Sequence, residues 1–156
     1  LGDASYMLHV QQFACEGLNF GYFYDESPLI AYDDEPAPSY TMHTHTPSTA
    51  PGCRTPHLQL RDGRPLMDAL GPWYTLLRFD GAADIAPLVD AARKAGVPLS
   101  LLEVDCADLP AAYRHRLVLC RPDQHVAWRG DVLPADSAGL VDRLRGASPA
   151  HKESVA

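Results

Sequence analysis

The stretch from Arg116 to Gly130, near the carboxyl end of the chain, constrains the fold more than any other. Leu117–Cys120 is an unbroken apolar run, which is typical of a strand buried on both faces of a sheet. Pro122 and Asp123 come next, in the two central places of a turn, because proline presets φ and aspartate bonds its own backbone. The pattern predicts a β-hairpin around which the preceding elements pack.

The second strand of this hairpin is expected over His125–Arg129, and Gly130 ends it. Side chains alternate along a strand, so Val126 and Trp128 are expected to share one face of the sheet. The other face then receives the remaining three side chains, those of His125, Ala127 and Arg129.

Strand and helix patterns alternate over the rest of the carboxyl half of the chain. The expected strands are His57–Leu60, Trp73–Phe79 and Leu99–Val104, and the expected short helices are Leu66–Leu70 and Leu109–Tyr113. One longer helix is predicted after a cap at Asp84, with an apolar stripe of Ile85, Leu88, Val89 and Ala92 and a stop at Gly96. A last helix runs from Ser137 to Gly146. Strands that alternate with helices indicate an α/β fold, here a thioredoxin-like mixed sheet flanked by helices.

The amino-terminal part has a different pattern. A short helix is predicted over residues 3–14, and the alternating apolar residues of Leu18–Tyr24 predict a strand that resumes at Leu29–Tyr32. Two aromatic-rich strands are too few for a stable sheet, so this extended segment is expected to pack on something absent from the chain.

A proline-rich stretch separates the two parts, since six of the fourteen prolines fall between Pro28 and Pro56. Proline mixed with Ser, Thr and acidic residues is typical of a stiff, extended linker. The predicted organisation is an upstream-domain tail over residues 1–35, a linker over 36–52, a thioredoxin-like domain over 53–147 and a polar tail over 148–156.

Charge and hydropathy exclude several classes of partner. The formal charge of −7 argues against nucleic acid, because phosphate binding needs a basic face. No apolar run approaches the roughly 20 residues of a membrane-spanning helix, and no signal-peptide pattern is present, so the expected location is the cytoplasm.

The four cysteines do not suggest thiol chemistry. Cys15, Cys53, Cys106 and Cys120 are widely and irregularly spaced, with no Cys-x-x-Cys pair. A working thioredoxin needs a reactive thiolate at the start of the helix after its central strand, and residues 80–84 contain no cysteine. Dithiol oxidoreductase activity is therefore not expected, and the cysteines are predicted to be reduced and structural.

Two groups of polar residues are site candidates, each with a simpler alternative. His43 and His45 have a spacing that some metal sites use, but zinc sites normally have at least three protein ligands, and a solvated linker is the commoner interpretation. A polar cluster at one edge of the domain is the second candidate, for which a salt-bridged surface is the commoner interpretation. Its members are Arg54, His57, Arg121, Asp123, His125 and Arg129.

Three segments together resemble the carboxyl-terminal part of FAD-dependent aromatic hydroxylases of the phenol hydroxylase type. The segments are Gly17–Ile30, the Pro-Gly-x-Arg-x-Pro-His motif within Thr46–His57, and the Arg-Pro-Asp-x-His-Val-Ala-Trp-Arg hairpin within Leu119–Arg129. The resemblance implies a parent enzyme with an FAD domain, a substrate domain and a thioredoxin-like domain without redox cysteines. It implies FAD and NAD(P)H as cofactors of the parent, bound upstream, with the upstream domains as partners and a homodimer as one possible assembly.

The resemblance assigns no residue of this chain to catalysis, cofactor binding or metal binding, and the chain alone is expected to bind no cofactor. The implied function is the non-catalytic terminal portion of a monooxygenase that hydroxylates phenolic or other aromatic compounds with O2. Two alternatives remain open: a free-standing, redox-inactive interaction module of the thioredoxin fold, and a peroxidase or glutathione-linked relative.

Overall fold

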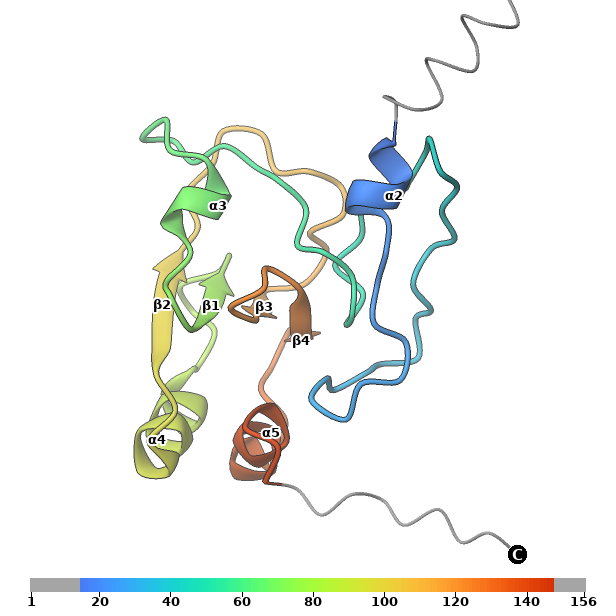
Figure 1. Ribbon diagram of the computed structural model, residues 1–156. Helices are drawn as coiled ribbons and strands as arrows, with labels where there is room; N and C mark the ends of the chain where they lie inside the picture. The colour runs from blue at the N-terminus through green and yellow to red at the C-terminus, as the bar shows by residue number, and fades with distance from the viewer. Residues whose placement is uncertain (1–14, 148–156) are drawn as a thin grey trace, which may run out of the picture.

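The structure is a computed structural model that describes residues 15–147. The helix predicted over residues 3–14 and the polar tail over 148–156 lie outside the described residues. The helices and strands are α2 (Glu16–Phe20), α3 (Leu66–Ala69), β1 (Tyr74–Arg78), α4 (Ala86–Ala95), β2 (Leu99–Glu103), β3 (Leu117–Cys120), β4 (Val126–Gly130) and α5 (Ser137–Leu144) (Figure 1).

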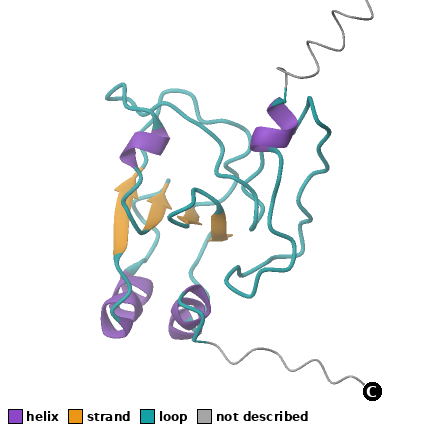
Figure 2. Cartoon of the chain, viewed as in Figure 1, coloured by secondary structure: helices purple, strands orange, loops and turns teal. Residues whose placement is uncertain are grey.

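The four strands form one mixed sheet in the order β2-β1-β3-β4. β1 and β2 run parallel, and α4 supplies the crossover that a parallel pair requires. β3 pairs antiparallel with both β1 and β4, so the predicted hairpin of β3 and β4 lies in the same sheet as β1 (Figure 2). The expected α/β architecture, a mixed sheet flanked by helices, is confirmed.

Each face of the sheet carries its own apolar core. α4 and α5 cover one face, and the core there consists of Tyr74, Leu76, Ala83, Leu88, Ala92, Leu117, Leu119, Ala127, Leu140, Val141 and Leu144. The chain around α3 covers the other face, with a core of Leu58, Leu60, Leu66, Leu77, Tyr113, Val118, Cys120 and Val126. β3 contributes to both cores, as its unbroken apolar sequence predicts.

The predicted end of α4 at Gly96 is confirmed, whereas its N-cap is Ile85 and not Asp84. The carboxylate of Asp84 accepts a hydrogen bond from the Ala86 backbone N–H at 3.0 Å, and Gly96 ends the helix with φ 67°. Leu88 and Ala92 are buried as expected, but Val89 is 40% exposed, so the buried stripe is narrower than predicted. None of the helices within residues 15–147 is long and apolar enough to cross a membrane.

Two predictions about the sheet region were wrong. The stretch 57–60 is not a strand and makes only a single bridge, between Gln59 and Pro65. Leu109–Tyr113 is a turn rather than a helix, closed by the Tyr113 N–H on the Pro110 carbonyl, because proline cannot continue a helix from within. β2 is an edge strand with partly exposed side chains, since no strand lies outside it in the described sheet.

The hairpin turn is as predicted, but the second strand contains a bulge. The Gln124 N–H bonds the Arg121 carbonyl at 3.0 Å, and Gln124 takes a left-handed φ of 66°. Leu119 then pairs with Trp128, whereas Cys120 pairs with Val126, so Ala127 is an extra residue. Val126 and Trp128 were expected to share a face, and the bulge instead sends them to opposite cores.

Residues 15–52, here called the arm, pack along the free edge of β4 on the side of the sheet opposite β2 (Figure 1). The Ala31 N–H bonds the Ala127 carbonyl at 2.9 Å, and the Gly52 N–H bonds the Val126 carbonyl at 2.8 Å. These bonds satisfy backbone groups that an edge strand otherwise leaves unpaired.

The strands predicted within the arm were wrong. Glu16–Phe20 is a short helix, and Leu29–Tyr32 contains no strand, although Ile30 is fully buried. This helix packs closely against a later part of the arm, since a Cβ on Gly17 would lie 2.0 Å from the Thr41 carbonyl oxygen. Phe23 retains one bridge of the expected strand, to Cys53.

Candidate functional site

The structure divides the polar residues predicted to form one edge cluster into two groups. Arg54, Arg121, Asp123 and His125 lie together at the hairpin turn, which we call the turn cluster. Arg129 lies at the other end of β4 among residues of the arm, and His57 is exposed on the wall of a cavity. A single site built from all six residues is therefore wrong.

The turn cluster holds a buried imidazole against two tyrosine rings of the arm. The His125 side chain is 1% exposed, and its ring centre lies 5.1 Å from that of Tyr22 and 4.9 Å from that of Tyr24. Nδ1 lies 3.0 Å from the Asp123 backbone carbonyl, whereas Nε2 is buried with no hydrogen-bond partner among the described residues. The Arg121 guanidinium sits 5.4 Å from the Tyr24 ring centre, so the cluster joins the turn to the arm.

Burial and neighbouring charge set the protonation of this cluster. Burial lowers the pKa of His125, and the positive charges of Arg54 and Arg121 lower it further against the opposing effect of Asp123. Burial alone would raise the pKa of Asp123, but the hydrogen bonds from Arg121 outweigh it and lower that pKa. At neutral pH the cluster therefore combines a neutral imidazole with a charged Arg121–Asp123 pair at 3.0 Å.

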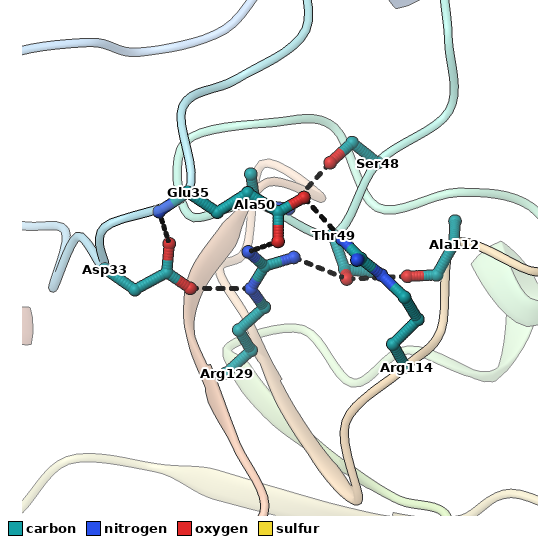
Figure 3. A network of polar contacts seen from close by, with 8 residues as sticks. All are labelled: Asp33, Glu35, Ser48, Thr49, Ala50, Ala112, Arg114 and Arg129. Atoms are coloured by element: carbon teal, nitrogen blue, oxygen red, sulfur yellow. Dashed lines mark hydrogen bonds and ion pairs between the residues drawn. The ribbon is translucent and has the colours of Figure 1, made fainter.

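The second group centres on Arg129, whose side chain is 1% exposed (Figure 3). Its Nε donates to Asp33 at 2.7 Å, one terminal nitrogen donates to Glu35 at 2.8 Å, and the other donates to Thr49 at 3.2 Å. The Thr49 hydroxyl in turn donates to the Ala112 carbonyl at 2.8 Å, and Arg114 pairs with Glu35. We call these residues the Arg129 network; they connect two parts of the arm to β4 and to the loop before β3.

The charges in the Arg129 network compensate one another. Burial alone would raise the pKa of Asp33, but the Arg129 hydrogen bond outweighs it and holds that pKa below its usual value. Glu35 behaves likewise, with Arg114 and Arg129 lowering its pKa against the effect of burial. A buried arginine persists only when carboxylates satisfy it, so this group is a structural connection rather than a reactive one.

Sequence reasoning missed the carboxylates and the threonine of this network because they lie in the stretch taken for a tail and linker. One signal was available: Asp33-Asp34-Glu35 is the sole run of three consecutive acidic residues in the chain. A strand position that places arginine toward the sheet core needs such a partner.

A cavity of about 490 Å³ lies between the arm and the segment of the Pro-Gly-x-Arg-x-Pro-His motif. The arm contributes Phe20, Gly21, Pro38, His45, Thr46, Pro47 and Ser48, and the rest of the wall is Cys53, Arg54, Thr55, Pro56, His57, Met67 and Pro110. Its volume is within the range of small-molecule sites.

The histidine pair of the arm is not a metal site within the described residues. Among residues 15–147 no three His, Cys, Asp or Glu side chains gather closely enough to hold a metal ion. The nearest described carboxylate oxygen to His45 Nδ1 is that of Glu16, at 3.5 Å, and the His45 ring packs near Phe20.

Burial makes the thiols of Cys53 and Cys120 unreactive. Cys120 is fully buried, which raises its pKa to about 12, and burial also raises the pKa of Cys53. Both stay protonated near neutral pH and are poor nucleophiles. Cys106 is half-buried beside the second core.

The described residues do not fit a complete flavin dinucleotide. A pyrophosphate group is normally held by a glycine-rich turn at a helix N-terminus, whereas Gly21 of the cavity follows the C-terminus of α2. The turn before α4 carries Asp80 and Asp84, whose charges oppose a phosphate. The geometry therefore supports docking of the arm and of a small ligand, and no cofactor step is assigned to this chain.

Comparison with known proteins identifies the family of the chain. Residues 48–147 match the family described as aromatic-ring hydroxylase, C-terminal. The chain is 35% identical over 124 residues to the FAD-dependent monooxygenase apdD of Emericella nidulans, covering 74% of this chain and 20% of that protein. It is 31% identical over 155 residues to the phenol 2-monooxygenase of a Pseudomonas species, covering 86% of this chain and 25% of that protein.

Solved structures of flavin-dependent enzymes also resemble this chain. RebC with bound 7-carboxy-K252c matches with a TM-score of 0.78 and 34% identity, over 89% of this chain and 26% of that one. Aklavinone-11 hydroxylase in complex with FAD and aklavinone matches with a TM-score of 0.60 and 31% identity, over 83% of this chain and 27% of that one.

The chain thus spans between a fifth and about a quarter of the length of these relatives. The family match covers residues 48–147, which include the hairpin, both apolar cores and the motif at the cavity. The chain belongs to the aromatic-ring hydroxylase C-terminal family.

Proposed function

We propose that this chain acts as the terminal, non-catalytic section of an FAD-dependent monooxygenase that hydroxylates phenolic or related aromatic compounds with NAD(P)H and O2. The observation that carries the proposal is the family match over residues 48–147, to a domain found in proteins about four times longer. In this proposal FAD and NAD(P)H bind upstream residues, and no residue of this chain contacts the reacting atoms.

The surface of the arm supports a role in domain packing. Its exposed large apolar side chains, between 38% and 52% accessible, are Leu18, Phe20, Tyr22, Tyr24, Tyr32, Tyr40 and Met42. Apolar side chains gathered on one segment mark an interaction surface, since isolated domains rarely leave many of them in water. We propose that the FAD and substrate domains of the parent cover this surface, with residues 1–35 as the tail of those domains and 36–52 as the crossing.

The sheet region supplies a rigid base for that packing. We propose that residues 53–147 are a redox-inactive relative of thioredoxin, because their helices flank one mixed sheet while residues 80–84 lack a cysteine. A cytoplasmic location and a homodimeric parent complete the proposal.

The decisive experiment has two parts. The reading frame that contains this sequence should encode an upstream glycine-rich dinucleotide loop, and its complete product should purify with FAD and oxidise NADPH when a phenol is added. The 156-residue chain, mixed with FAD and desalted, should be colourless and should oxidise no NADPH. Sedimentation of the complete product reports the homodimer.

A different result would favour the free-standing interaction module. In that case the reading frame would contain no dinucleotide loop, and the chain would recover a separate partner protein. A chain that retains one equivalent of FAD would contradict the assignment of the cofactor site to upstream residues.

A further inference from the structure

The cavity beside the Pro-Gly-x-Arg-x-Pro-His motif has walls suited to a flat apolar group. Four prolines line it, at positions 38, 47, 56 and 110, together with the Phe20 ring and the Met67 side chain. These residues come from the arm and from three separate places in the sheet region, so the folded chain builds the cavity from distant segments. Its volume of about 490 Å³ accommodates a one- or two-ring molecule.

Besides the neutral Thr46, Ser48 and Thr55, the polar side chains on the same wall are basic ones. The lining includes Arg54, His45 and His57 and contains no aspartate or glutamate, although the chain has 20 acidic against 13 basic residues. The wall therefore has the opposite charge preference to the chain as a whole, and it is complementary to an anion.

Arg54 is placed to receive that anion. Its guanidinium lies 5.6 Å from the Phe20 ring centre, and one terminal nitrogen donates to the Gln124 side-chain oxygen at 2.8 Å. Among residues 15–147 no carboxylate lies within ion-pair distance of Arg54, whereas Arg121 and Arg129 each have one. Its charge is therefore held in place by a ring and an amide without being neutralised, and its remaining donors are available.

His45 adds a second unsatisfied group. Its side chain is 14% exposed, and Nδ1 makes no hydrogen bond within the described residues, since Glu16 at 3.5 Å does not complete one. Buried polar atoms without partners are few in folded proteins, and one on a cavity wall indicates a missing ligand or water.

We propose that this cavity binds an aromatic carboxylate, with the ring between Phe20 and the prolines and the carboxylate on Arg54. The cavity is lined only by residues of this chain, so the inference does not depend on the proposed function. An aromatic carboxylate combines a flat ring, which suits proline and phenylalanine, with a single negative charge, which supplies the partner that Arg54 lacks.

Isothermal titration of the full chain with 2-naphthoate tests the proposal. We expect saturable binding at one equivalent, and binding at least tenfold weaker for uncharged 2-naphthylmethanol, because a charged hydrogen bond is lost. Cyclohexanecarboxylate, which keeps the charge and loses the flat ring, should also bind more weakly. No saturation with 2-naphthoate, or equal affinity for the three compounds, would overturn the proposal.

Matched arginine variants locate the site. Arg54→Met should weaken 2-naphthoate binding at least tenfold, whereas Arg64→Met, which removes the same charge outside the cavity, should leave the affinity unchanged. Arg64 is 58% exposed and pairs with Asp62, so this control tests for non-specific attraction. Equal loss in both variants would contradict the site.

Met67→Trp provides a second variant that retains every charge. The larger side chain fills part of the cavity from α3 and should abolish binding while the far-ultraviolet circular dichroism stays that of the wild type. In the wild-type chain, the ¹³C-methyl resonance of Met67 should shift on addition of 2-naphthoate. An unchanged Met67 resonance at saturation would place the ligand elsewhere and overturn the proposal.

Discussion

At the scale of single residues, Arg129 makes the contact on which the arm most depends. A guanidinium that is 1% exposed has lost nearly all of its water, and two carboxylates and a hydroxyl replace that water. Asp33 and Glu35 remain partly exposed, so most of the desolvation cost falls on the arginine. Removing a carboxylate would leave the buried arginine without a countercharge. The loss of stability would therefore be larger than the partial exposure of that carboxylate suggests.

Arg129→Met should lower the free energy of unfolding by about 3–5 kcal/mol, because Asp33 loses its countercharge, Glu35 keeps only Arg114, and the bonds between the arm and β4 are lost. Urea unfolding followed by circular dichroism measures the change. The matched control is Arg93→Met, an arginine that is 77% exposed and pairs with Asp90, which should cost less than about 1 kcal/mol. Equal costs for the two variants would contradict a structural role for the Arg129 network.

His125 makes stability depend on pH. Its ordinary pKa is 6.5, and burial lowers the pKa in the folded chain, so the unfolded chain binds more protons between the two values. Stability therefore decreases as the pH falls below about 6.5 toward the folded pKa. Asp33, Glu35 and Asp123, whose pKa values are lowered from 3.8, 4.5 and 3.8, lose their contributions only at more acidic pH.

His125→Gln should consequently lose less stability than the wild type between pH 7 and pH 5, whatever its stability at pH 7. Unfolding free energies from urea titrations at half-unit pH intervals give the slope. The groups facing His125 are Asp123, Arg54 and Arg121 together with the rings of Tyr22 and Tyr24. The lowered pKa of Asp123 keeps that carboxylate charged throughout this window. A wild-type slope in the variant would show that another group carries the dependence.

At the scale of elements, Gly52 is the point at which the end of the arm contacts both Tyr24 and β4. Its φ is +98°, and an added Cβ would lie 2.1 Å from the Tyr24 carbonyl oxygen. Both backbone groups of Gly52 form hydrogen bonds: its carbonyl accepts from the Tyr24 N–H at 3.1 Å, and its N–H donates to the Val126 carbonyl of β4. Glycine is required twice, for the left-handed conformation and for the space.

Gly52→Ala should lower the free energy of unfolding by at least about 3 kcal/mol, from backbone strain and displacement of the arm. Gly63→Ala is the matched control, because its φ is +88° but nothing lies within 4 Å of an added Cβ. That variant should cost about 1–2 kcal/mol, the conformational part alone. Thermal unfolding of both variants separates the two terms, and similar losses would contradict the close approach.

Elements specified by neighbouring residues were predictable from the sequence. The turn at Pro122 and Asp123 and the end of α4 at Gly96 depend on local backbone preferences, and the structure confirms them. The bulge at Ala127 and the helix at Glu16–Phe20 depend on partners distant in sequence, which periodicity does not report. The site followed the same rule: the turn cluster was found, whereas the Arg129 network and the full wall of the cavity were not.

At the scale of the whole molecule, the arm and the sheet region share hydrogen bonds, ion pairs and buried side chains. Ile30 is fully buried, the Arg143 guanidinium donates to the Ile30 carbonyl at 3.4 Å, and Thr49 bonds Ala112. A linker that only crossed between domains would make few such contacts. We infer that the two parts unfold together.

A shortened chain that begins at Ser48, where the family match starts, should therefore be less stable than the full chain by at least the cost of Arg129→Met. It loses both carboxylates of the Arg129 network and the cover over β4. Differential scanning calorimetry measures the difference, and the full chain should give a single transition. A full chain with two transitions, the second matching that of the shortened chain, would show that the arm is independent.

The contact between Arg129 and Asp33 joins residues 96 positions apart in the chain. During synthesis at about 5–20 residues per second, the acidic residues leave the ribosome roughly 5–20 seconds before their arginine does. Throughout that interval the arm lacks the β4 edge to which its backbone bonds in the folded chain. We therefore expect the arm to contact whatever part of the protein is made before it, ahead of its contact with β4.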